Sequence, residues 1–159
     1  MEHIIVNLFG HRLIIVSDKG KIVSISFDSH KNFKLLKTKS KENKQSIILN
    51  QAVTQFENYF IKKNQKFELE IKFIGTDFQK LVWQELLTIP YGQTRTYQEI
   101  AESIGKPKAY RAVASAVAKN PVIIIVPCHR VIRTSGLIGQ YLAGTILKKE
   151  LLKLEGLKI

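Results

Sequence analysis

The stretch Ile123-Ile124-Ile125-Val126-Pro127-Cys128-His129-Arg130-Val131-Ile132 places the only cysteine of a 159-residue chain inside an apolar, β-branched run. Such a run predicts buried extended chain, and its proline keeps the preceding valine out of the α region, so Cys128 should be presented from a stiff backbone. His129 and Arg130 flank the thiol with groups that favour thiolate over a thiol of pKa about 8.5. The pattern favours a nucleophile, although free cysteine is also common as a small core side chain.

Length and composition indicate a globular protein with a polyanionic partner. A chain of 159 residues that is 45% hydrophobic can bury the core of one domain or two small ones. The net charge of +12 suggests nucleic acid, because bound lysine and arginine release counterions, although lysine-rich chains also occur without such a partner. The part from Thr76 onward has 12 basic and 6 acidic residues and the part before it 13 and 7, so charge does not locate a binding face.

No apolar run approaches the roughly 20 residues of a membrane span, and the N-terminus lacks a signal-peptide pattern, so we expect a cytoplasmic protein without membrane contact. One cysteine cannot form an internal disulfide, which fits a reducing compartment.

The first half of the chain alternates between β-branched runs and turns, which predicts an antiparallel meander. Six lysines in fourteen residues then predict a solvated loop or a short exposed segment, with phosphate binding as an alternative role. A helical apolar pattern and one further alternating run follow. The predicted strands are residues 3–9, 12–16, 22–27 and 67–71, the loop is 31–44 and the helix is 47–61.

The second half reads as helical, and we place the domain boundary between residues 74 and 75, giving domains 1–74 and 75–159. Thr76 with Gln79, and later Thr96 with Glu99, form capping-box patterns that begin helices. The helix after Thr96 should end near residue 104, and a glycine turn leads to a second helix over 108–119. Two short helices around a tight turn predict a helix-turn-helix.

The helix over 108–119 is unusually rich in alanine. Small residues permit either dense helix packing or close approach to a ligand, whereas a helix that reads bases in the major groove carries long polar side chains. Arg111 is the one long cation in its alanine-rich part, which suits insertion into a duplex, with a plain phosphate contact as the alternative.

A glycine-punctuated segment, 134–144, is long enough to fold over a pocket. A helix should follow over 145–154, and Glu155 lies at its C-terminal end, where the helix dipole disfavours an acid. That carboxylate is therefore either on a frayed surface or held by a partner.

The segment 127–132, preceded by Asn120-Pro121-Val122, resembles the active-site signature of the O6-alkylguanine-DNA alkyltransferases. The likeness extends from Thr76 to Gly156 with consistent order and spacing, whereas the N-terminal half carries no comparable motif. The further matching motifs are Phe78-Gln79, Val82-Trp83, Ile89-Pro90-Tyr91-Gly92, Thr94, Thr96-Tyr97, Arg111-Ala112-Val113 and Glu155-Gly156.

This resemblance implies an α+β fold, with a ribonuclease H-like sheet and helix before a mostly helical domain. It implies DNA repair by irreversible, stoichiometric transfer of the alkyl group from O6-alkylguanine, and less well from O4-alkylthymine, after base flipping in duplex DNA. Cys128 would be the acceptor, His129 a base acting through a water, and Glu155 the group that orients the imidazole. The implied protein is a monomer that needs no cofactor and no metal.

The resemblance also suggests roles for other residues. Asn120 would tie down the active-site segment, Tyr97 would donate a hydrogen bond to the departing guanine, and Arg111 would fill the space of the flipped base. Leu142 and Ala143 depart from the small residues more usual in the family, which leaves tolerance of bulky alkyl groups open. The predicted catalytic residues are Cys128, His129, Glu155, Asn120 and Tyr97; the DNA contacts are Arg111, Ala112, Thr96, Ser115 and Arg130; the pocket residues are Tyr97, Val131, Gly139, Tyr141, Leu142 and Lys148.

Two other functions compete with this interpretation. A DNA-binding regulator would use the helix-turn-helix with a structural cysteine, but its second helix would need long polar side chains. A Cys-His hydrolase would need turnover. A cysteine-based zinc site is excluded by the single thiol, and the remaining histidines, His3, His11 and His30, are scattered.

Overall fold

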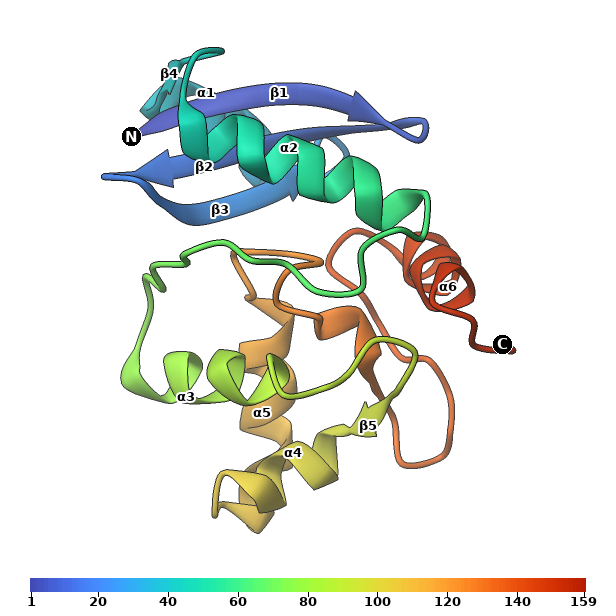
Figure 1. The fold of residues 1–159 in the computed structure, drawn as a ribbon. Helices are drawn as coiled ribbons and strands as arrows, with labels where there is room; N and C mark the ends of the chain where they lie inside the picture. Colours follow the sequence, from blue (N-terminus) through green and yellow to red (C-terminus); the bar gives the residue numbers. More distant parts are fainter. The chain divides into compact units, whose positions relative to one another are not determined.

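The computed structural model describes all 159 residues, which form two compact units, Met1–Ile74 and Gly75–Ile159 (Figure 1). None of its helices has both the length and the apolar character needed to cross a membrane.

The first unit is built on a four-stranded sheet in the order β3-β2-β1-β4. The strands β1 (Glu2–Leu8), β2 (His11–Asp18) and β3 (Lys21–Phe27) pair antiparallel in sequence, which confirms the predicted meander. The two-residue strand β4 (Lys41–Glu42) was not predicted, and it pairs parallel with β1, so the sheet is mixed.

Helices cover both faces of this sheet. The predicted helix is confirmed as α2 (Ile47–Phe60), which lies across one face (Figure 1). Of the two alternatives for residues 31–44, the loop is wrong, because α1 (Asn32–Lys39) forms there and packs on the other face, with most of its residues exposed. Its Phe33 is buried against the sheet and Leu36, one turn later, is packed beside it, so two apolar residues suffice to dock a lysine-rich helix.

The predicted strand over 67–71 is wrong as well. Only Ile71 forms a bridge, with Ile22, while the residues before it are irregular. The ring of Phe67 instead packs against α2, with its centroid 4.9 Å from that of Phe56 and 5.5 Å from that of Tyr59. Side-chain packing on the helix therefore replaces strand pairing here.

The second unit contains the predicted helices. They are α3 (Asp77–Leu86), α4 (Tyr97–Ser103) and α5 (Tyr110–Ala118), with a 3₁₀ turn, η1 (Pro107–Ala109), before α5. Both capping boxes are present: the backbone N–H of Gln79 donates to Thr76 and that of Glu99 donates to Thr96. The helices α4 and α5 pack together in helix-turn-helix order.

Buried contacts join these helices to the remaining elements. Trp83, predicted as a core residue, is buried, and its indole Nε1 donates to the carbonyl of Ala116 at 2.8 Å, which joins α3 to α5. The short strands β5 (Arg95–Thr96) and β6 (Val131–Ile132) pair in parallel and were not predicted. The last helix, α6 (Thr145–Leu154), begins and ends as expected.

Candidate active site

The segment before the cysteine is buried, as predicted, but it is not extended. The N–H of Ile125 donates to the carbonyl of Ile123 at 2.9 Å around Ile124, whose φ of +71° is a strained value for a β-branched residue. The N–H of Cys128 donates to the carbonyl of Val126 at 2.8 Å around the proline. These two γ-turns lead into a 3₁₀ turn, η2 (Cys128–Arg130), which carries the thiol.

Asn120 holds the folded segment together. Its Nδ2 donates to the carbonyl of Val126 at 2.8 Å, and its Oδ1 accepts from the N–H of Val122 at 2.9 Å. The side-chain amide supplies a donor and an acceptor side by side, and the side chain is buried. The structure thus places Asn120 where the tight turns need support.

Burial raises the pKa of the Cys128 thiol above its usual range. Hydrogen bonds from Asn120 and Tyr141 and the charge of Lys148 oppose this effect without overcoming it. The prediction that His129 and Arg130 favour the thiolate is therefore wrong, because burial is the largest effect on this pKa. Both of these neighbours bind Glu155 instead. The resting group is a thiol, which needs a base before it can act as a nucleophile.

A group that could act as this base lies next in the sequence. Nε2 of His129 is 2.8 Å from Oε1 of Glu155, and both side chains are fully buried. A carboxylate at Nε2 fixes the tautomer with hydrogen on that nitrogen, which leaves Nδ1 to accept a proton. Nδ1 is buried and has no hydrogen-bond partner within the protein. Burial lowers the pKa of His129 against the opposing effect of Glu155, so the resting imidazole is neutral.

Glu155 also binds Arg130. Nε and Nη2 of this arginine donate to the two carboxylate oxygens at 2.9 and 2.8 Å, and Nη1 donates to the carbonyl of Ile89 at 2.6 Å. Burial alone would raise the pKa of Glu155, but the hydrogen bonds from His129 and Arg130 lower it to about 2. Arg130 is only 7% exposed, so the prediction that it contacts DNA is wrong.

The turn after α3 completes the surroundings of this carboxylate. The N–H of Gly92 donates to Oε2 of Glu155 at 3.3 Å, and the hydroxyl of Tyr91 donates to the carbonyl of Leu154 at 3.2 Å. Gly92 has a φ of +77°, and a Cβ there would lie 3.0 Å from the backbone oxygen of Glu155. A glycine is required by both the conformation and the close approach.

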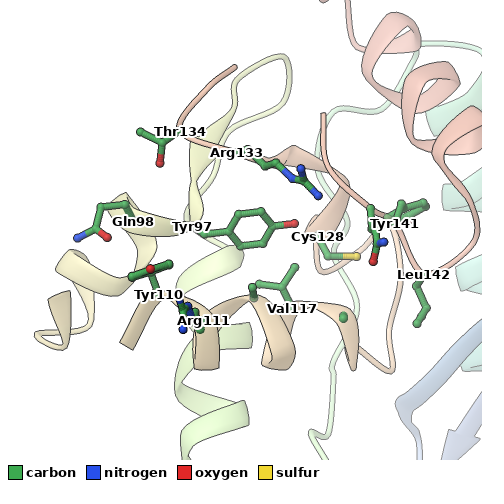
Figure 2. A pocket seen from close by; sticks show the side chains of 13 residues that line it. Tyr97, Gln98, Tyr110, Arg111, Val117, Cys128, Arg133, Thr134, Tyr141 and Leu142 are labelled. Carbon is green, nitrogen blue, oxygen red and sulfur yellow. The ribbon is translucent and has the colours of Figure 1, made fainter. Parts of the chain in front are cut away.

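The thiol opens onto a cavity of about 490 Å³ (Figure 2). Tyr97, Tyr141 and Leu142 line it, as predicted, whereas Val131 and Lys148 are buried and are not among its lining residues. Gly139 lies at its edge, since a Cβ there would be 3.7 Å from the hydroxyl of Tyr97. The lining consists of Tyr97, Gln98, Tyr110, Arg111, Ala114, Val117, Ala118, Cys128, Arg133, Thr134, Gln140, Tyr141 and Leu142.

Lys148 is fully buried beside this cavity. Its Nζ donates to the carbonyl of Val131 at 2.5 Å and lies 3.5 Å from the carbonyl of Gln140, so it joins β6 to the segment 134–144. Burial lowers its pKa to about 8, while Cys128, when ionised, acts to raise it. A protonated Lys148 is therefore a cation near the thiol.

The small-residue face of α5 is exposed. Ala112 and Ser115 are open to solvent, so this face does not serve dense helix packing. Arg111 projects from the same helix, with Cζ 5.8 Å from the ring centroid of Tyr110. Thr96 caps α4 through its hydroxyl and is half-buried, which leaves its predicted DNA contact untested.

Sequence comparison matches both halves of the chain to one family. Residues 77–157 match the DNA binding domain of 6-O-methylguanine DNA methyltransferase, and residues 9–73 match its ribonuclease-like domain. The chain belongs to the 6-O-methylguanine DNA methyltransferase family. A methylated-DNA–protein-cysteine methyltransferase of Methanosarcina barkeri is 54% identical over 114 residues, which cover 72% of this chain and 71% of that protein.

Solved structures of this family are similar over nearly the whole chain. The crystal structure of Mycobacterium tuberculosis O6-methylguanine methyltransferase is 37% identical, with a TM-score of 0.88 over 97% of this chain and 92% of that one. The M. tuberculosis protein in complex with DNA is 38% identical, with a TM-score of 0.86 over 97% and 91% of the two chains.

Several cavity residues of this family member were not predicted from sequence. Gln98, Tyr110, Arg133 and Thr134 line the cavity beside the predicted residues. Gln98 and Tyr110 sit on consecutive helices and reach the cavity only because α4 and α5 pack together, and no local pattern marks such positions. Arg133 lies five residues after the cysteine, where a polar residue after a strand is the only signal.

Proposed function

We propose that this protein repairs DNA by direct damage reversal, transferring the alkyl group from O6 of guanine in duplex DNA to the sulfur of Cys128. The proposal rests on a cysteine that opens onto a cavity and is followed in sequence by His129, whose imidazole forms a buried pair with Glu155. Membership of the 6-O-methylguanine DNA methyltransferase family supports it.

The proton of the thiol leaves first. Nδ1 of His129 takes it through a water, and Glu155 stabilises the imidazolium that forms. The sulfur then attacks the alkyl carbon, so the S–C bond forms, the C–O6 bond breaks, and its electron pair passes to the guanine. Burial and the charge of Cys128 raise the pKa of Tyr97, so its hydroxyl is protonated at neutral pH and can donate to the departing base.

The product is a thioether, which thiol exchange does not reverse, so each molecule repairs one lesion. Cofactors and metals have no step in this transfer. The cavity must receive an extruded nucleotide, because the target atom lies inside the base stack; unstacking costs a few kcal/mol, and less for a damaged base. Arg111 would fill the space that the base leaves, while the small side chains of Ala112 and Ser115 would allow α5 to approach the duplex closely.

We further propose that the domain roles follow the division at residues 74 and 75, with DNA binding and alkyl transfer in 75–159. A transfer that consumes a reduced thiol fits the reducing conditions of the cytoplasm. The regulator alternative lacks support, because α5 presents no array of long polar side chains and the cysteine has a base beside it.

The test is loss of the lesion. Duplex DNA containing O6-methylguanine is incubated with excess protein and digested to nucleosides, which are separated by chromatography. The modified nucleoside should be replaced by guanosine with wild-type protein and should persist with Cys128→Ala. Persistence with both proteins would contradict the proposal.

A further inference from the structure

Arg133 is a cation of the cavity to which the mechanism above gives no role. It follows β6, and its side chain lines the same cavity as Cys128 and Tyr97. Its N–H donates to the carbonyl of Leu137 and its carbonyl accepts from the N–H of Gly136, each at 2.9 Å. These two hydrogen bonds close a turn that fixes where the side chain starts.

The guanidinium lies at the tyrosine end of the cavity. Figure 2 shows it extending past the hydroxyl of Tyr97 toward the side on which Cys128 lies. A Cβ at Gly139 would be 3.6 Å from Nε of Arg133 and 3.7 Å from the hydroxyl oxygen of Tyr97, so both polar groups flank one spot. The base that Tyr97 would contact therefore enters next to Arg133.

No acidic group neutralises this cation. Of the other three arginines of this unit, Arg95 binds Glu85 and Arg130 binds Glu155, while Arg111 lies over the ring of Tyr110. Arg133 forms neither a salt bridge nor a side-chain hydrogen bond. Its charge acts on the cavity instead: it lowers the pKa of Tyr97, against the larger raising effects of burial and of Cys128.

We propose that Arg133 stabilises the negative charge that the guanine acquires as its C–O6 bond breaks. The inference rests on the proposed alkyl transfer. When the sulfur bonds to the alkyl carbon, the C–O6 electron pair moves into the purine, and Tyr97 moves its hydroxyl proton toward that base. Both changes place negative charge beside Arg133. A guanidinium offers several N–H donors and a positive charge but no acceptor, so Arg133 acts through hydrogen bonds and charge.

The competing role is a contact with a phosphate of the extruded nucleotide, since arginine binds phosphates well and this side chain is exposed. The two roles predict that loss of Arg133 affects different substrates. A phosphate contact matters only for DNA, whereas stabilisation of the departing base also matters for the free base and depends on how stable its anion is.

The experiment compares wild type, Arg133→Gln, Arg133→Lys and the matched surface variant Lys153→Gln. Second-order rates of methyl transfer are measured by intact mass with free O6-methylguanine and with its 8-bromo analogue, whose anion is more stable. Arg133→Gln should react about tenfold more slowly with O6-methylguanine, less than the loss of a fully enclosed oxyanion donor causes, and the deficit should shrink with the 8-bromo base. Arg133→Lys should recover part of the rate, and Lys153→Gln should match wild type.

An equal deficit with both bases, or no deficit, would overturn the proposal. A deficit confined to duplex DNA, with a salt slope reduced by about one, would identify a phosphate contact instead. If wild type itself transfers no methyl group, the proposed function fails, which is a separate outcome. Thermal unfolding of each variant checks folding, and Arg133→Ala repeats the comparison if the glutamine variant unfolds.

Discussion

Replacing Glu155 with glutamine should destabilise the protein as well as slow it. The carboxylate accepts hydrogen bonds from His129, from two nitrogens of Arg130 and from the N–H of Gly92. A glutamine can accept at one oxygen only, and it leaves the guanidinium buried without a counterion. The change therefore breaks a buried ion pair from one side.

Two estimates of the cost agree. Removing one partner of a buried pair costs about 3–5 kcal/mol. Independently, a carboxyl whose pKa falls from 4.5 to about 2 on folding contributes roughly 3 kcal/mol at neutral pH, at about 1.4 kcal/mol per pH unit. For a chain of this size each kcal/mol lowers Tm by about 2–4 °C, so a cost of roughly 3 kcal/mol, the value common to both estimates, corresponds to a loss of roughly 6–12 °C.

The assay is thermal unfolding of wild type, Glu155→Gln and Glu57→Gln, the last being the same change at an exposed position without side-chain partners. Because the folded pKa of Glu155 lies below the unfolded value, its stabilisation is complete above pH 4.5 and is lost as the pH falls toward 2. The gap between wild type and Glu155→Gln should close over that range. A Tm within 2 °C of wild type at pH 7, or a gap independent of pH, would refute the reasoning.

The remaining predictions concern single residues around the same site. Arg111→Ala at saturating protein should slow single-turnover repair of a paired lesion, recover rate opposite a mismatch and react normally with the free base; equal loss on all three would mean that Arg111 supports the fold. Asn120→Ala should lower the free energy of unfolding by about 2–4 kcal/mol, because it strands two buried backbone groups, and urea titration would measure this. The pH profile of the wild-type transfer rate should show a downward inflection near pH 8, the pKa of Lys148, because that cation is neutralised above it. The profile of Lys148→Met should lack this inflection.

Prediction from sequence succeeded where residues close together in the sequence determine the local structure. The two capping boxes at Thr76 and Thr96 each specify a helix start within four residues, and both are present. The antiparallel meander follows from alternation and tight turns, and Trp83 was assigned to the core from its place on an apolar helix face.

Prediction from sequence failed where contacts between residues distant in the sequence determine the backbone conformation or the partner of a side chain. The apolar run before Cys128 suggested a strand, but the amide of Asn120 holds it in two γ-turns. Arg130 was included among the DNA contacts that the resemblance suggests, but the fold brings Glu155, 25 residues away, against it. The direction of the Cys128 pKa shift was also predicted wrongly, because the effect of burial on the thiol outweighs that of the charged and polar groups around it.

A titration to completion tests whether each protein molecule takes one alkyl group on Cys128 and is then inactive. Protein is mixed with increasing amounts of duplex DNA containing O6-methylguanine, and methylated protein is measured by intact mass and by mapping of the peptide that contains Cys128. Methylation should reach a plateau at one methyl group per protein molecule, located on Cys128, and the modified protein should repair no further lesion. Continued removal of lesions beyond one equivalent, or a methyl group on any other residue, would contradict it.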